Sequence, residues 1–200
     1  MARFRGSIVK KARNLGGTLD GYPKTENLRR NFPSGPHGQA RKKRSEYAVQ
    51  LREKQKVRYT YGVSEKQFRT RYYERATRKK GVTGTIMLQF LEQRFDNVLY
   101  RSGLAHSRSQ ARQIIVHGHM LVNGHKVDIP SYEIKPGEVI GVKSNSQAFV
   151  RANLEGRNPF VPHWIETNLG ELSVVVKALP EREDIDPEIK EHLIIEYYSR

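Results

Sequence analysis

The sequence predicts an α+β fold, in which a basic helical domain built from both ends of the chain holds a small inserted α+β domain. Between Arg94 and Val142, two short helices are followed by a β-hairpin and a further strand. The N-terminal part is helical and strongly basic, and the C-terminal tail is acidic and partly apolar. We therefore place the basic domain at residues 1–92, completed by residues 179–200, and the inserted domain at residues 93–178.

The central stretch has clear element boundaries. Its first helix is expected to end at Gly103, and a Ser-x-x-Gln capping box at Ser107–Gln110 begins the second, which ends at Gly118. The apolar face of the second helix consists of Ala111, Ile114 and Ile115. Asn123-Gly124 then separates two short apolar runs, which is typical of a type I′ hairpin because both turn residues take positive φ.

The N-terminal part is expected to contain four helices. Serine residues begin the first three, and these are Ser7, Ser45 and Ser64. An apolar helix starts at Thr85. In the third helix, Phe68, Tyr72 and Ala76 share one face, which we interpret as part of a core rather than as a platform for stacking bases.

Beyond the hairpin, the sequence predicts two strands, Val139–Val142 and Glu171–Val176, in one sheet. A short helix is expected over Ser146–Leu154. Asp186-Pro187-Glu188 is a typical helix start, and Leu193–Tyr198 is largely apolar. The acidic tail is therefore expected to pack on the basic N-terminal helices.

Charge is distributed unevenly along the chain. Residues 1–80 contain 23 Lys and Arg against 6 Asp and Glu, whereas residues 81–200 contain 13 against 15. A segment with a net charge of +17 repels itself unless an anion covers it, and nucleic acid is the commonest such anion. The charge therefore favours a nucleic-acid-binding protein.

Motifs of common enzymes and metal sites do not occur in the sequence. There is no cysteine, which excludes disulfides and thiolate metal ligands. There is no phosphate-binding Gly-Lys-Ser/Thr loop and no His-Glu-x-x-His motif, and Asp96 is expected to form a local salt bridge or to cap backbone groups. We expect no enzyme activity, cofactor, metal or small-molecule substrate. No apolar run is long enough for a membrane span and no signal-peptide core is present, so we expect a soluble intracellular protein without a membrane partner.

The second helix of the central stretch offers a site for a nucleic-acid backbone. Its unpaired backbone N–H groups and positive dipole end are expected at Ser107. Arg108 and Arg112 are four residues apart and share a helix face, where two guanidinium groups suit phosphate oxygens. Uncharged groups suited to sugar hydroxyls are supplied by Gln110, Gln113, His117 and His119.

A basic run, Arg41–Arg44, follows a strap rich in Gly and Pro. Such a run can be a localisation signal or a solvated surface, but phosphate contact is the preferred interpretation beside a helix start. The full set of predicted nucleic-acid contacts adds cations of the N-terminal helices and polar residues of the central stretch. These residues are Arg41, Lys42, Lys43, Arg44, Arg52, Lys54, Lys56, Arg58, Arg69, Arg71, Arg94, Arg101, Ser107, Arg108, Gln110, Arg112, Gln113, His117, His119, Asn123 and Lys126.

The central stretch resembles the S-four RNA-binding domain. The matching residues are Arg94-x-Asp96-Asn97, Ser107-Arg108-x-x-Ala111-Arg112, His117-Gly118-His119 and Val122-Asn123-Gly124-x-x-Val127. The flanks resemble the family of ribosomal small-subunit protein four, of the bacterial and organellar type. The segments that carry this likeness include Leu51–Lys56, Glu65–Arg69, Gly81–Gly84 and Glu196–Arg200.

The resemblance implies a primary rRNA-binding protein that binds the 5′ domain of small-subunit rRNA, nucleates assembly of the subunit body and contributes to translational accuracy. It implies contacts with ribosomal protein S-five, with other small-subunit proteins and with mRNA near the point where mRNA enters. The expected location is a ribosome, cytoplasmic or organellar. Many relatives carry a four-cysteine zinc knuckle near the N-terminus, so this thiol-free segment must fold through other contacts.

Two other functional classes remain open from the sequence. One is an RNA-modifying enzyme that carries an S-four domain, which the chain length and the lack of a catalytic domain disfavour. The other is a free RNA-binding regulator, such as a repressor of its own message, a role that can coexist with a ribosomal one.

Overall fold

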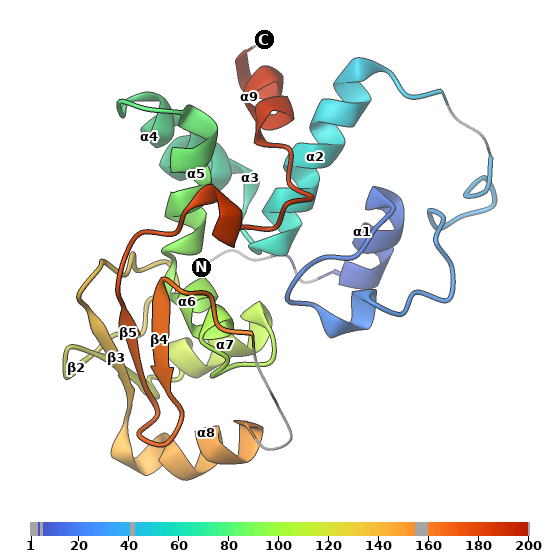
Figure 1. Ribbon diagram of the computed structural model, residues 1–200. Helices are drawn as coiled ribbons and strands as arrows, with labels where there is room; N and C mark the ends of the chain where they lie inside the picture. The colour runs from blue at the N-terminus through green and yellow to red at the C-terminus, as the bar shows by residue number, and fades with distance from the viewer. Residues whose placement is uncertain (1–3, 5, 41–42, 155–159, 200) are drawn as a thin grey trace. The chain divides into compact units, whose positions relative to one another are not determined.

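The computed structural model describes residues 4, 6–40, 43–154 and 160–199 (Figure 1). The chain forms two compact units. The terminal unit comprises Met1–Leu88 and Asp186–Arg200, and the inserted unit comprises Gln89–Ile185. Helices make up the terminal unit, and the inserted unit combines helices with a five-stranded sheet. The predicted fold class, with a helical part built from both ends of the chain, is confirmed.

Three helices of the terminal unit begin at serine caps, as predicted. The elements are α1 (Ile8–Leu15), η1 (Pro23–Thr25), α2 (Glu46–Thr60), α3 (Glu65–Gln67), η2 (Phe68–Tyr73), α4 (Glu74–Thr77) and α9 (Glu191–Ser199). The side chains of Ser7, Ser45 and Ser64 accept hydrogen bonds from backbone N–H groups three residues later, at 3.4, 3.3 and 3.5 Å. Each bond satisfies a donor that the first turn of a helix leaves unpaired.

Three helices differ from the prediction in type or in starting residue. The helix that follows Ser64 contains a π-helical turn, η2, between two α-helical turns. Helix α5 (Thr83–Glu92) begins two residues before Thr85, because the N–H of Ile86 already bonds to the carbonyl of Val82. Helix α9 begins at Glu191 rather than at Asp186, because the Asp186 carboxylate accepts a bond from the N–H of Glu188 and closes a local turn.

The acidic tail packs on the N-terminal helices of the terminal unit through α9. The Tyr47 and Tyr197 rings are 5.5 Å apart, and Gln50 Nε2 donates to Glu196 Oε2 at 3.0 Å. The Tyr198 ring stacks on Tyr73 at 4.5 Å. These contacts join segments that are more than a hundred residues apart in the sequence, so the tail is part of the core of this unit.

An apolar cluster holds the N-terminal segment together without thiols. Ala12, Leu19 and Tyr59 are buried at its centre. The Thr25 hydroxyl is also buried, and it accepts from the N–H of Leu19 at 3.0 Å and donates to the carbonyl of Tyr22 at 2.8 Å. Apolar packing and one buried hydroxyl therefore provide the other contacts that this segment was expected to need.

The inserted unit contains a small antiparallel sheet. Its helical elements are α6 (Phe95–Arg101), α7 (Arg108–Val116), η3 (Ser144–Ser146), α8 (Gln147–Leu154) and η4 (Arg182–Asp184). Its strands are β1 (Met120–Val122), β2 (His125–Lys126), β3 (Val139–Val142), β4 (Ile165–Asn168) and β5 (Ser173–Val176), in the order β2-β1-β3-β5-β4 (Figure 1). The predicted hairpin is confirmed, with φ of 49° at Asn123 and 81° at Gly124. Strand β4 was not predicted.

One continuous core joins the helices of the inserted unit to its sheet. Phe95, Val98 and Leu99 of α6 and Ile114 and Ile115 of α7 are buried in it. The buried residues of the sheet, including Met120, Ile140 and Val174, belong to the same cluster. The sheet therefore packs on α6 and α7, which fixes the positions of the polar residues at the ends of these helices.

Candidate nucleic-acid interface

The start of α7 is held by a capping arrangement that extends one residue further than predicted. Ser107 Oγ accepts a bond from the N–H of Gln110 at 3.2 Å. Gln110 Oε1 accepts from the N–H of His106 at 2.6 Å, rather than from the N–H of Ser107. This geometry fixes the first turn of α7, where the dipole end carries partial positive charge.

The guanidinium groups of Arg108 and Arg112 pack against α6. Arg108 is 3% exposed, donates to Asn97 Oδ1 at 2.8 Å and lies over the Tyr100 ring at 4.5 Å. Arg112 Nη1 is 3.9 Å from Asp96 Oδ2. Both guanidinium groups are thus largely buried against α6, and phosphate contact by Arg108 and Arg112 stays a prediction. Their structural role is to join the two helices.

A buried ion pair lies at the start of α6, between its N-cap residue Arg94 and Asp96 in its first turn. Arg94 is 1% exposed, and its guanidinium donates to both oxygens of Asp96, at 3.1 and 2.8 Å. The expectation that Asp96 forms a local salt bridge is confirmed. The predicted RNA contact of Arg94 does not fit its burial.

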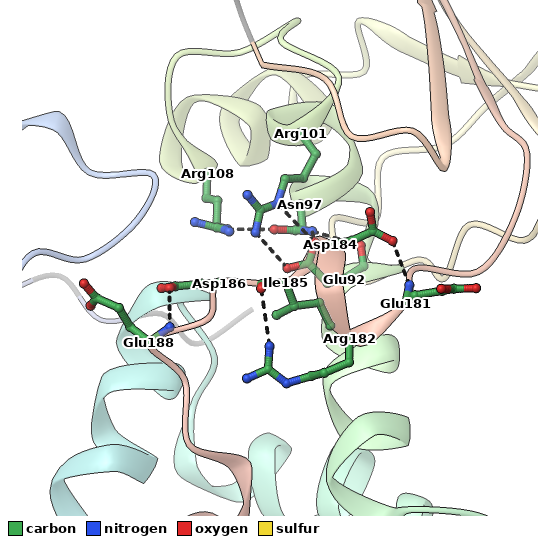
Figure 2. A network of polar contacts seen from close by, with 10 residues as sticks. All are labelled: Glu92, Asn97, Arg101, Arg108, Glu181, Arg182, Asp184, Ile185, Asp186 and Glu188. Atoms are coloured by element: carbon green, nitrogen blue, oxygen red, sulfur yellow. Dashed lines mark hydrogen bonds and ion pairs between the residues drawn. The ribbon is translucent and has the colours of Figure 1, made fainter.

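A second polar network ties α5 to α6 within the inserted unit (Figure 2). Arg101 donates to both oxygens of Glu92 at 3.2 Å, and Asn97 Nδ2 donates to Glu92 Oε2 at 2.6 Å. Figure 2 shows Arg108 directed toward Asn97, so the network continues to α7. Removing one partner of a buried ion pair typically lowers the free energy of unfolding by about 3–5 kcal/mol. This network is therefore important for holding α5, α6 and α7 together. The predicted RNA contact of Arg101 is therefore secondary to its bond with Glu92.

Exposed polar and aromatic side chains lie at the C-terminal end of α7. Gln113 and His117 are exposed, and His119 Nδ1 is 2.8 Å from Ser146 Oγ. The His119 ring lies 5.9 Å from that of His117 and 5.6 Å from that of Phe149. Phe149 is 51% exposed, and the sequence reasoning missed it because it lies in α8, about thirty residues further along the chain.

Two of the predicted RNA contacts lie in the hairpin, and they are Asn123 and Lys126. Asn123 Oδ1 accepts a bond from the N–H of Val139 at 2.9 Å, so its side chain supports the turn. Lys126 is exposed, and its side chain lies against Gly118. Gly118 has a φ of 74°, in the left-handed region that favours glycine.

Several predicted cations of α2 hold the terminal unit together. Lys54 is 3% exposed and donates to Glu65 at 2.7 Å, and Arg58 Nη1 is 3.5 Å from the other oxygen of Glu65. Lys56 pairs with Glu188 at 2.8 Å, and this bond holds the pKa of Glu188 below its usual value. Lys54 therefore has a structural role in this unit, because its side chain is buried and bonded to Glu65, and its RNA contact stays a prediction.

Arg52 bridges two elements of the terminal unit. Its Nε donates to the carbonyl of Leu15, at the end of α1, at 2.8 Å. Burial lowers the pKa of Arg52, and the nearby charge of Arg44 lowers it further. The two cations are thus close enough to reinforce each other's positive potential.

Other predicted cations of the terminal unit are exposed. Lys43, Arg44 and Arg71 are exposed, and Arg69 is 66% exposed while paired with Glu74 at 3.2 Å. The first half of the basic run, Arg41–Lys42, lies outside the described residues. These side chains are accessible to a ligand, and their contact with RNA phosphates stays a prediction.

Family profiles match most of the chain. The ribosomal protein S4/S9 N-terminal domain matches residues 3–92, and the S4 domain matches residues 93–140. The chain is 52% identical over 207 residues to the small ribosomal subunit protein uS4 of Gloeobacter violaceus and 50% identical over 204 residues to that of Nocardia farcinica. It is 48% identical over 206 residues to that of Pelodictyon phaeoclathratiforme, and all three alignments cover both chains completely.

No helix within the described residues is long and apolar enough to cross a membrane. Within the same ranges, no group of three or more His, Cys, Asp or Glu side chains is placed to hold a metal ion.

Proposed function

Because the chain belongs to the ribosomal protein S4 family, we propose that it is an rRNA-binding structural component of the small ribosomal subunit. The observation that carries this proposal is the likeness to small ribosomal subunit proteins over the entire chain, at about half of all positions. The family consists of structural, non-enzymatic proteins, so the chain is not an RNA-modifying enzyme.

We propose further that the RNA ligand is the 5′ domain of small-subunit rRNA and that binding occurs early in assembly of the subunit body. The exposed cations of the terminal unit support this, because they can neutralise phosphates where several RNA helices meet. The capped start of α7 and the polar side chains at its end give the inserted unit a rigid shape for recognition.

Finer partners are part of the same proposal. They are ribosomal protein S-five, neighbouring small-subunit proteins and mRNA near the point where it enters, with an influence on decoding accuracy. We also propose that residues 1–92 with 179–200 and residues 93–178 are the folding domains. Hydrogen exchange tests this division, since the amides of residues 1–92 with 179–200 are expected to lose protection together, and those of residues 93–178 in a separate step.

Co-sedimentation with ribosomes tests the main proposal. A tagged chain is expected to sediment with small subunits at one copy per subunit and to remain there after a wash in moderate salt. A chain found mainly in the ribosome-free fraction, bound to a few messages, would instead be a free RNA-binding regulator.

A further inference from the structure

A hollow of about 640 Å³ opens on the N-terminal segment of the terminal unit. Val9 of α1 and Leu28 form its apolar wall, and the Asn27 side chain contributes an amide. Leu28 also packs on the cluster around Ala12, so the wall continues into a buried core. The size is in the range of sites that bind ligands, roughly 300–1,000 Å³.

Four cationic side chains line this hollow: Arg13, Lys24, Arg29 and Arg30. None of its lining residues, all within the described stretch 6–40, carries a carboxylate. Cations of α2 show the opposite arrangement, since Lys54 and Lys56 each pair with a glutamate at 2.7 and 2.8 Å. Convergent cations without a carboxylate among them create a strongly positive potential, which favours an anion.

Hydrogen bonds hold Arg13 and the chain beside Lys24 in place. Arg13 Nε donates to the carbonyl of Phe32 at 3.0 Å, and its guanidinium lies 5.5 Å from the centre of the Phe32 ring. Thr25, beside Lys24, is fully buried and bonded to Leu19 and Tyr22. Since Arg13 is held at one side of the hollow, this side chain loses less freedom when an anion binds.

We propose that this hollow binds phosphate groups of an RNA backbone at a bend in the strand. Arginine guanidinium groups suit phosphate oxygens because they can form two parallel hydrogen bonds, and the Asn27 amide can donate another. The space exceeds that of one phosphate group, so two successive phosphates fit the four cations. The proposal deepens the proposed function, on which it rests, and it adds residues outside the predicted RNA contacts.

The test compares charge removal with filling of the hollow. In Arg29→Ala/Arg30→Ala, two cations are lost, and the slope of log affinity against log salt is expected to fall by roughly 1.4–1.8. In Asn27→Trp the charge is unchanged, but the indole occupies the space. Asn14→Trp places the same side chain at an exposed position of α1 that does not line the hollow. Circular dichroism and thermal unfolding check that all variants fold.

Filter binding of the full-length protein uses a transcript of the small-subunit rRNA 5′ domain and an unrelated structured RNA of equal length. Asn27→Trp is expected to bind both RNAs about tenfold more weakly than the wild type at 0.2 M salt. This figure assumes that two phosphate contacts are lost, that each contributes about 0.8 to the slope of log affinity against log salt, and that the two proteins bind equally at 1 M salt. Asn14→Trp is expected to bind as the wild type does.

Wild-type affinity of Asn27→Trp for both RNAs would overturn the proposal, because the cations would then act only by diffuse attraction. Equal weakening by Asn27→Trp and Asn14→Trp would overturn it as well. A wild-type protein that binds both RNAs equally would contradict the proposed function. If Asn27→Trp nevertheless weakens RNA binding and Asn14→Trp does not, the proposal that the hollow binds phosphate groups is still supported.

Discussion

Glu65 is the polar centre of the helices in the terminal unit. Its carboxylate accepts from Lys54 at 2.7 Å and from the Tyr198 hydroxyl at 2.8 Å, and Arg58 lies 3.5 Å away. Burial raises the pKa of Glu65, but the hydrogen bonds and positive charges outweigh burial and hold this pKa below its usual value. Burial raises the pKa of Tyr198, and the bond to Glu65 raises it further, so the hydroxyl stays protonated and donating.

Acid is expected to weaken the terminal unit through this carboxylate. The folded pKa is below the unfolded value of about 4.3, so the stabilisation is complete above the unfolded pKa and is lost as pH falls through the folded pKa. In urea denaturation, Glu65→Gln should be less stable than the wild type at neutral pH, and the difference should shrink below roughly pH 5. Glu171→Gln, at an exposed glutamate, is the control. A constant difference across this range would contradict the assignment.

The sequence allowed us to predict ion pairs between neighbouring residues, but not those between residues that folding brings together. The local salt bridge expected of Asp96 forms with Arg94, two residues earlier in the chain. The sequence could not reveal that Glu92 binds Arg101 across nine residues, since that distance depends on how α5 and α6 turn. The sequence therefore could not show which cations are paired with a carboxylate that comes close only after folding.

Local chemistry determined which elements could be predicted. The serine caps and the Asn123-Gly124 turn were predicted correctly because their signals lie within four residues. Strand β4 was missed because it pairs only with β5 at the edge of the sheet, and its residues Ile165–Asn168 follow a weakly patterned loop. The π-helical turn of η2 also has no simple sequence signal.

Removing α9 is expected to destabilise only the terminal unit. Deletion of residues 186–200 removes the Tyr197 and Tyr198 rings and exposes the apolar surface that they cover on α2 and η2. Hydrogen exchange should show lost amide protection over Glu46–Thr77, while strands β1, β3 and β5 stay protected. Tyr198→Phe, which keeps the ring but loses the bond to Glu65, should lose less protection. Full protection of α2 in the truncated protein would show that the tail is merely appended.

For the whole molecule, the two units carry different polar surfaces. The terminal unit contains all of residues 1–80, with their net charge of +17, and presents exposed cations such as Lys43, Arg44 and Arg71. In the inserted unit, Arg94, Arg101 and Arg108 are engaged in internal contacts, which leaves mainly uncharged groups near the end of α7. We therefore expect the terminal unit to supply most of the affinity and the inserted unit most of the discrimination among RNAs.

A salt titration of RNA binding tests this division most directly. Replacing Arg41, Lys42, Lys43 and Arg44 together with Ala should reduce the slope of log affinity against log salt by up to about 3 and weaken binding to all RNAs alike. Replacing Gln113 and His117 with Ala should leave the slope unchanged and reduce the preference for the 5′-domain RNA over unrelated RNA. If the basic-run variant loses this preference while the Gln113/His117 variant keeps it, the account is contradicted.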